Sequence, residues 1–194
     1  MPSNSTALIL IDIQQGLDEL DYYGGERNNP QAEEKAAMVL LYWRQQQWPI
    51  FHIKHNSSNS ESPLHPSRSG NAIKDIVQPL PHEPLIEKEV NNAFTSTDLQ
   101  QRLEANGITE LVIVGLTTEH CVSSTVRVGA NLGFSVTLVS DATAAFCKTA
   151  SNGKHYDAET VHEIAIANLA DEFARIQTAE EVLLALQSNR SEDR

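Results

Sequence analysis

The chain has 194 residues, 40% of them hydrophobic, and a formal net charge of −12 at pH 7. This length suits one sizeable core, so we predict a single domain over residues 1–194, with its core at about 6–180 and a polar tail at 188–194. Nucleic acids and anionic membrane surfaces are negatively charged themselves. The acidic balance therefore argues against both as partners.

The cysteine content points to a reducing compartment. Cys121 and Cys147 are the only cysteines, too few for a disulfide framework, and no apolar segment of a secretory signal follows the N-terminus. The longest apolar runs, such as residues 7–11, have the length of a strand and are too short to cross a bilayer. We therefore expect a cytoplasmic protein.

Short β-branched runs alternate with helical patterns along the chain. Strands are predicted at residues 7–13, 49–55, 85–88, 111–115, 135–139 and 174–177. Helices are predicted at about residues 31–47, 97–105, 119–132, 158–169 and 179–187. This order predicts an α/β fold of the Rossmann-like kind, a three-layer, doubly wound, mostly parallel sheet with helices on both faces. Residues 56–84 form the one long irregular stretch, which we expect to frame a pocket.

Three residues that can do chemistry stand at predicted strand ends, where open α/β sheets bind ligands. Asp12 ends the first strand, Lys88 ends the third, and Cys121 follows the fourth at the start of a helix. Taken singly, an aspartate there would more often be a solvated strand end, and a free cysteine a small core residue. Together they favour a catalytic group, because a buried carboxylate needs partners.

The ionisation of Cys121 is open to two influences. The dipole and free N–H groups of a helix start favour a thiolate, and Lys88 would add to this effect. A neighbouring Asp12 carboxylate would oppose it, so the two groups could share one proton. Cys147 has no comparable setting, and we expect it to be an inert structural residue.

Several segments in order resemble the isochorismatase-like cysteine hydrolase family, which includes nicotinamidases. They are Leu10-Ile11-Asp12-Ile13-Gln14, Glu87-Lys88 with Asn92-Ala93-Phe94 behind it, Val114-Gly115-Leu116-Thr117-Thr118-Glu119-His120-Cys121-Val122, and Asp141-Ala142. The resemblance implies that Cys121 is the nucleophile, that Asp12 is the general base and acid, and that Lys88 stabilises the charged pair. It covers about residues 6–180.

The resemblance also implies further features of the site. The peptide bond between Leu116 and Thr117 would be cis, and the backbone N–H groups of Thr117 and Cys121 would form an oxyanion hole. Family position and loop placement suggest pocket walls at Leu17, Tyr22, Tyr23, Phe94 and Phe146. Family habit suggests a homodimer or homotetramer.

The chain departs from the nicotinamidase pattern at the metal site. The Asp-x-His motif that follows the second strand in nicotinamidases is replaced by His55-Asn56-Ser57. We therefore expect no metal and no other cofactor, although the spacing leaves open whether His52, His55, His65 and His82 form a ligand site.

The presence of a cysteine at position 121 limits the type of bond that the protein is expected to hydrolyse. Family members that hydrolyse isochorismate, a vinyl ether, lack the cysteine, so Cys121 favours hydrolysis of a C–N bond in a small amide or imide through a thioester. Two alternatives stay open: hydrolysis of a vinyl ether or other non-amide bond, and a catalytically idle binding or scaffold protein with the same fold.

Overall fold

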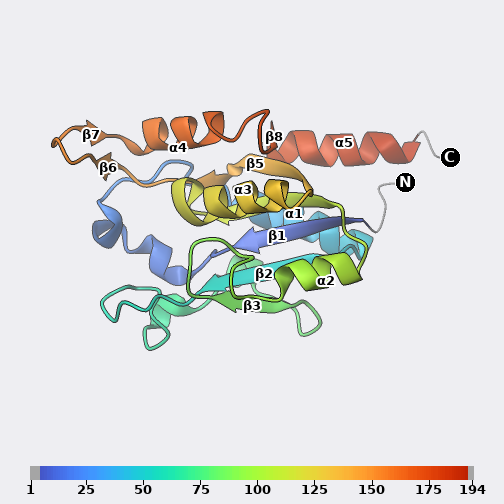
Figure 1. The fold of residues 1–194 in the computed structure, drawn as a ribbon, viewed down its shortest axis with the longest axis horizontal. Helices are drawn as coiled ribbons and strands as arrows, with labels where there is room; N and C mark the ends of the chain where they lie inside the picture. The colour runs from blue at the N-terminus through green and yellow to red at the C-terminus, as the bar shows by residue number, and fades with distance from the viewer. Residues whose placement is uncertain (1–4, 192–194) are drawn as a thin grey trace.

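Six strands pair into one sheet in the computed structural model, which describes residues 5–191 (Figure 1). The strands, in the order they occupy across the sheet, are β3 (Leu85–Lys88), β2 (Ile50–His55), β1 (Thr6–Ile11), β4 (Glu110–Leu116), β5 (Ser135–Ala144) and β8 (Arg175–Gln177). Every pairing within this sheet is parallel. The chain winds outward from β1 on one side and from β4 on the other, so the topological switch point lies between β1 and β4.

Helices cover both faces of the sheet, which confirms the predicted three-layer α/β fold. On one face lie α1 (Ala32–Gln46) and α5 (Ala179–Ser191); on the other lie α2 (Leu99–Ala105), α3 (Ser123–Asn131) and, farther along, α4 (Ala158–Ala167). None of the described helices is both long and apolar enough to cross a membrane.

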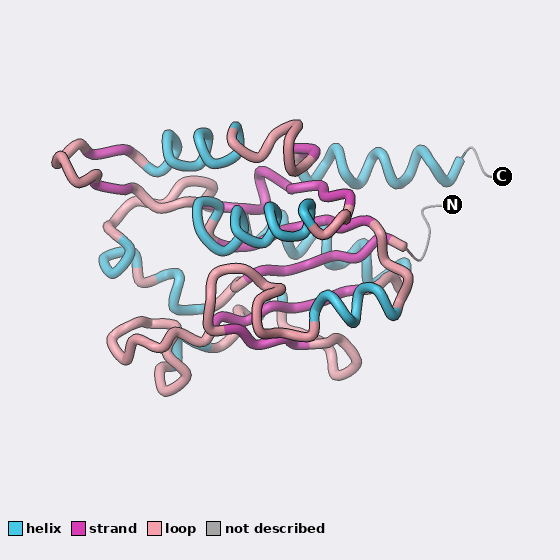
Figure 2. Tube along the Cα trace, viewed as in Figure 1, coloured by secondary structure: helices cyan, strands magenta, loops and turns pink. Residues whose placement is uncertain are grey.

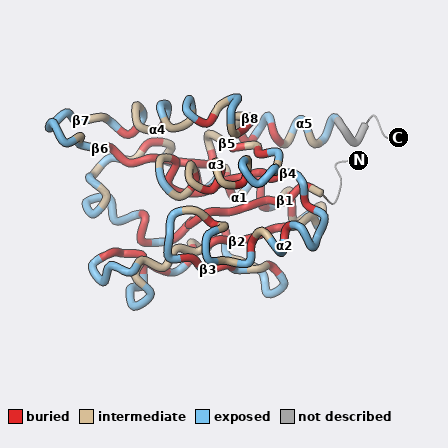
Figure 3. The backbone as a smooth tube through the Cα atoms, in the orientation of Figure 1, coloured by how far each residue is buried: buried red, intermediate tan, exposed pale blue. Residues whose placement is uncertain are grey.

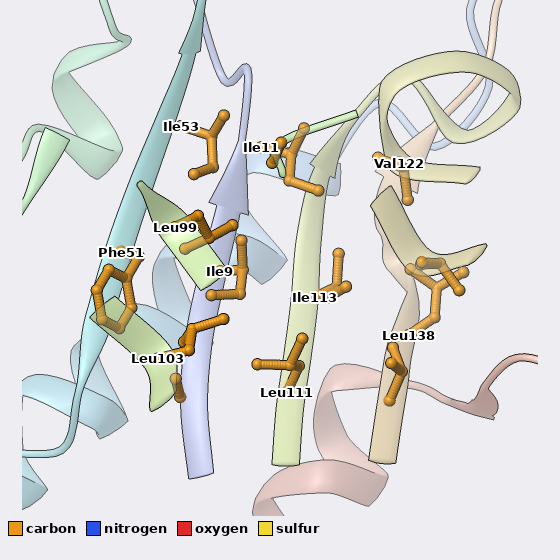
Figure 4. Packing of buried hydrophobic residues seen from close by; sticks show 14 of the residues in the cluster. Ile9, Ile11, Phe51, Ile53, Leu99, Leu103, Leu111, Ile113, Val122 and Leu138 are labelled. Atoms are coloured by element: carbon orange, nitrogen blue, oxygen red, sulfur yellow. The ribbon is translucent and has the colours of Figure 1, made fainter. Parts of the chain in front are cut away.

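The alternation of side chains along β1 explains the two layers. Ile9 and Ile11 belong to the core beneath α2 and α3, whereas Leu8 and Leu10 belong to the core beneath α1 and α5. Figure 4 shows the first of these cores, and Figure 3 shows that the central strands are buried along their length. A strand buried on both faces has to be apolar throughout, as the sequence of β1 is.

The structure moves several predicted boundaries. β1 ends at Ile11 and not at residue 13, because Asp12 adopts a positive φ of 50° and leaves the strand. β5 continues to Ala144, five residues beyond its predicted end, across an irregularity in its pairing with β4. Helix α5 extends to Ser191, so the first residues of the predicted tail are helical; residues 192–194 lie outside the described residues.

The sequence did not predict the short antiparallel hairpin of β6 (Lys148–Thr149) and β7 (His155–Tyr156). This hairpin projects beyond the sheet at one end of the molecule in Figure 1. The Asp141-Ala142 pair falls inside β5, where Asp141 accepts a hydrogen bond from the Ala179 N–H at 2.7 Å. The carboxylate thus anchors the start of α5 to the sheet.

Residues 56–84 wrap around the carboxyl ends of β1 and β2 without long regular elements, apart from the 3₁₀ turns Ser69–Asn71 and Asp75–Val77 (Figure 2). Gln14, fully buried, donates to the carbonyls of His55 at 3.0 Å and Asn71 at 2.8 Å, and accepts from the His55 N–H at 2.8 Å. Asn71 in turn donates to the Leu64 carbonyl at 2.8 Å. Two buried amide side chains therefore tie this loop to the end of β1.

Gly115 allows β4 to approach β1 at the switch point. Its φ is 128°, and a Cβ there would overlap the carbonyl oxygen of Ile11 on the neighbouring strand. Only glycine fits such a position, because it lacks the Cβ atom and tolerates positive φ.

Gly115→Ala is expected to destabilise the fold by more than about 4 kcal/mol, since it combines a backbone clash with an unfavourable φ. Gly107→Ala is the matched control, because Gly107 has a φ of 67° but no atom within 4 Å of the added Cβ. That control should lose about 1–2 kcal/mol. Urea unfolding measures both, and equal losses would show that the approach of β4 to β1 is not the constraint.

Candidate active site

Asp12, Lys88 and Cys121 meet at the carboxyl edge of the sheet. The Lys88 Nζ lies 2.6 Å from Asp12 Oδ2 and 3.4 Å from Cys121 Sγ. Asp12 is 1% exposed and Lys88 is 3% exposed. The structure thus brings together the three residues that the resemblance singled out, around one buried ion pair.

A tight turn after β4 places Cys121. The Leu116–Thr117 peptide bond is cis, as the resemblance implied, and a π-helical turn over Thr118–Val122 follows it. The N–H groups of His120 and Val122 both donate to the Thr117 carbonyl at 3.2 Å. Val122 packs fully buried in the core (Figure 4), whereas Cys121 lines a cavity.

The prediction that Cys121 begins an α-helix is wrong in detail, because α3 starts only at Ser123. The extra residue of the π turn changes which side chains face the core and which face the cavity. π-helical turns of this kind are frequent at functional sites.

A second hydrogen-bond cluster holds this turn from behind. The Thr118 hydroxyl lies 2.9 Å from His162 Nδ1 on α4, and both residues are buried. Burial lowers the pKa of His162, so its ring is neutral at neutral pH. α4 therefore supports the turn through a polar contact, a role that the sequence did not indicate.

The cavity beside Cys121 has a volume of about 210 Å³. Its walls come from five parts of the chain: the ends of β1 and β2, the 3₁₀ turns Gln15–Asp18 and Leu20–Tyr23 after β1, the loops after β2 and β3, the turn after β4, and the segment around β6. The lining residues are Asp12, Leu17, Tyr22, Tyr23, His55, Ser62, Leu64, Asn91, Leu116, Thr117, Glu119, His120, Cys121, Phe146 and Lys148. A larger cavity of about 650 Å³, lined by Arg44, Trp48 and Arg102 among others, contains none of the reactive residues.

Four of the five predicted pocket walls line the cavity. Leu17, Tyr22, Tyr23 and Phe146 do so, and the rings of Tyr23 and Phe146 stack with centroids 4.7 Å apart. The placement of Phe94 in the wall is wrong: its ring stacks on Phe134, 6.1 Å away, and packs against α3 in the core.

Sequence reasoning missed several residues that line the cavity. Asn91 adjoins the Asn92-Ala93-Phe94 segment, and its Oδ1 lies 3.9 Å from Cys121 Sγ. Glu119 and His120 line the cavity from the same turn that carries the nucleophile. Lys148 has no local signature, because only the fold of the β6–β7 hairpin brings it to the site.

Comparison with known proteins shows the family and the fold. A family model described as the isochorismatase domain matches residues 6–181. The chain belongs to the isochorismatase family. It is 46% identical to the Bacillus subtilis family protein YrdC over 177 residues, covering 91% of this chain and 94% of the relative. It is 30% identical to nicotinamidase 3 of Arabidopsis thaliana, covering 73% and 72%.

A crystal structure of an isochorismatase-family protein from Chromobacterium violaceum superposes with a TM-score of 0.91. The two chains are 40% identical, and the match covers 97% of this chain and 96% of the other. The present chain is therefore an isochorismatase-family hydrolase with the fold of that family.

The surroundings of Cys121 in this hydrolase favour the protonated form of its thiol. Burial first, and the Asp12 carboxylate next, raise the pKa of Cys121 above its usual value, and Lys88 offsets only part of this rise. Of the two influences that the sequence left open, burial and the Asp12 carboxylate therefore outweigh Lys88, and the thiol is protonated at rest. Asp12 Oδ1 is buried and has no hydrogen-bond partner among the described residues, and the Asp12 carboxylate lies within 4.8 Å of Cys121 Sγ. It is available to take the thiol proton.

His55 completes the surroundings of Lys88. Its Nδ1 lies 3.3 Å from Lys88 Nζ, and burial followed by the Lys88 charge lowers the pKa of the ring. The neutral imidazole can thus accept a hydrogen bond from the ammonium group. The other histidines in question lie apart: His52 bonds Glu83 at 2.9 Å, and His65 bonds Ser67 at 2.8 Å.

Asp12, His55 and Cys121 offer atoms within 4.8 Å of one another, a donor set that zinc accepts in proteins. The Lys88 ammonium contacts all three of these side chains, however. A metal ion there would face a fixed positive charge at its own position. The residues therefore fit an ammonium group better than a metal ion.

Removal of the ammonium group should be costly to the fold. Lys88→Met is expected to lose about 3–5 kcal/mol, because it leaves the Asp12 carboxylate buried without a counter-charge. The double variant Lys88→Met/Asp12→Asn should be more stable than Lys88→Met alone, since no charge then stays unpaired. Urea unfolding of the four proteins measures this coupling. Additive losses would contradict the buried ion pair.

Metal content is expected to be far below one equivalent per chain in the purified protein. Elemental analysis for zinc, iron and manganese, and melting curves before and after dialysis against a strong chelator, measure this. The melting temperature should not change, because Lys88 already supplies the positive charge. Stoichiometric metal whose removal lowers the melting temperature would show that other ligands hold an ion.

Proposed function

We propose that this hydrolase cleaves the C–N bond of a small amide or imide through a thioester on Cys121. The observation that carries the proposal is the contact of Cys121 Sγ with the buried Lys88–Asp12 pair in the wall of a cavity. Such a pair can accept the thiol proton at the moment of attack, so the nucleophile does not need to be ionised at rest.

Asp12, Cys121 and one water molecule account for every proton transfer in the proposed reaction. As Sγ attacks the carbonyl carbon, the thiol proton passes to Asp12, and the C–N bond then breaks as Asp12 returns this proton to the leaving nitrogen. Asp12 next takes a proton from a water molecule that attacks the thioester. The C–S bond breaks, the acid leaves, and the proton returns to Cys121. Lys88 stays protonated and balances the negative charge throughout.

Thr117 and Cys121 both line the cavity, and we assign their backbone N–H groups to the oxyanion that forms in each tetrahedral intermediate. Asn91, with its Oδ1 3.9 Å from Cys121 Sγ, is placed to accept a hydrogen bond from the amide nitrogen of the substrate. Both roles follow from position within the site.

Relatives support an amide substrate. Nicotinamidase 3 of Arabidopsis thaliana is named as an amidase, and a ureidoacrylate amidohydrolase of Agrobacterium fabrum is 38% identical over 72 residues, or 37% of this chain. Streptothricin hydrolase of Streptomyces noursei is 27% identical over 143 residues. A homodimer or homotetramer and a cytoplasmic location are further parts of the proposal.

Cys121→Ala should lower kcat by at least roughly 10³-fold, because it removes the nucleophile, and Asp12→Asn by at least roughly 10²-fold. The measurement is ammonia release from a panel of small amides, with circular dichroism to verify the fold. Cys147→Ala is the matched control: Cys147 is buried, donates to the Gly24 carbonyl at 3.1 Å and is not among the residues that line the cavity, so turnover by this variant should stay near wild type.

The intermediate can be observed directly. Rapid acid quenching during turnover should leave an acyl group on the peptide that carries Cys121, and none on the peptide that carries Cys147. Full activity of Cys121→Ala, or acylation of Cys147, would overturn the mechanism. Absence of any Cys121-dependent turnover would favour the idle-scaffold alternative.

A further inference from the structure

A second ion pair lines the same cavity as the reactive cluster. Glu119 Oε1 lies 3.3 Å from Lys148 Nζ, where the turn after β4 meets the segment around β6. The side chain of Glu119 is 11% exposed and that of Lys148 is 37% exposed. The catalytic proposal uses neither residue.

Glu119 lacks the hydrogen bonds that a buried carboxylate needs. Both of its oxygens are buried, and neither has a hydrogen-bond partner among the described residues. A carboxylate can accept about four hydrogen bonds, and burial without them is unfavourable. Glu119 therefore has capacity for donors supplied by a bound molecule.

The cavity, in contrast, offers no free positive charge. Among the described lining residues there is no arginine, and Lys148 is paired with Glu119. The neighbouring Lys88 is paired with Asp12. Burial lowers the pKa of both histidines in the wall, His55 and His120, so both rings are neutral at neutral pH.

We propose that Glu119 makes this site selective for small amides whose second polar group is a neutral N–H donor or a cation, and that it disfavours amides that carry a carboxylate. This inference rests on the proposed amide hydrolysis and names its substrate class. A donor group of the substrate satisfies the Glu119 oxygens, whereas a carboxylate meets like charge with no unpaired cation to receive it.

Size restricts the class further. The cavity volume of about 210 Å³ is below the range of roughly 300–1,000 Å³ that is typical of sites for drug-sized ligands. The substrate is therefore a compact molecule, with its scissile amide at Cys121 and its second polar group at Glu119. The stacked rings of Tyr23 and Phe146 supply an apolar wall beside these two ends.

Three probes of similar length separate the effect of charge. Succinamide ends in a second amide, succinamate ends in a carboxylate, and 4-aminobutanamide ends in an ammonium group. In the wild type, kcat/KM for succinamide and for 4-aminobutanamide should each exceed that for succinamate by at least roughly tenfold, a factor that corresponds to about 1.4 kcal/mol.

Two near-isosteric variants should move this preference in opposite directions. Glu119→Gln frees Lys148 and should raise kcat/KM for succinamate relative to 4-aminobutanamide by roughly tenfold. Lys148→Met leaves Glu119 unpaired and should shift the same ratio toward 4-aminobutanamide. A purely structural role of the pair would lower the rates with all three probes together and leave their ratios unchanged.

Binding separates this inference from the catalytic proposal. Calorimetry on Cys121→Ala should give the same order of affinities for the three probes. Charge-selective binding without turnover by the wild type would support the selectivity and overturn the amidase proposal. Equal kcat/KM for the three probes would support the amidase proposal and overturn the charge selectivity. Failure of Cys121→Ala to bind succinamide at millimolar concentration would also overturn the selectivity.

Discussion

The buried ion pair of Asp12 and Lys88 is the constraint on which the site depends. Two charges almost without solvent contact are tolerable only when they neutralise each other at short range, and here the separation is 2.6 Å. Asp12 directly follows β1 and Lys88 ends β3, with β2 between these two strands in the sheet. The ion pair therefore requires the ends of β1 and β3 to keep their relative position in the sheet.

The surrounding structure serves the same requirement. Gly115 lets β4 approach β1 closely, which brings the turn that carries Cys121 to the ion pair. Gln14, two residues after Asp12, bonds the end of β2 and the loop that follows, and so holds His55 beside Lys88. These are buried polar contacts with fixed geometry, and they explain how irregular backbone can form a defined cavity wall.

Charge is arranged in pairs throughout the site, and this has consequences for both reaction and selectivity. Burial and the Asp12 carboxylate of the first pair raise the pKa of the Cys121 thiol, and in the proposed mechanism the same carboxylate removes the thiol proton. The second pair, of Glu119 and Lys148, offers a carboxylate short of hydrogen bonds but no free cation. Each ion pair has no net charge. The electrostatic field that a bound substrate meets in the cavity therefore depends on how the charged groups of the two pairs are oriented.

The sequence by itself determined the layered α/β fold, because strands buried on both faces must be apolar throughout and the helices between them carry one apolar face. It also indicated Asp12, Lys88 and Cys121, since parallel strands place their carboxyl ends at one edge. It did not determine the π-helical turn or the protonated thiol, which depend on packing and burial around Cys121. Nor did it place Phe94 in the core or Lys148 at the cavity, because the positions of these side chains follow from contacts with segments distant in the chain. The local sequence pattern specifies the helices, the strands and the residues at the strand ends. The protonation of the Cys121 thiol and the residues that line the cavity depend on contacts between distant segments, which only the tertiary structure decides.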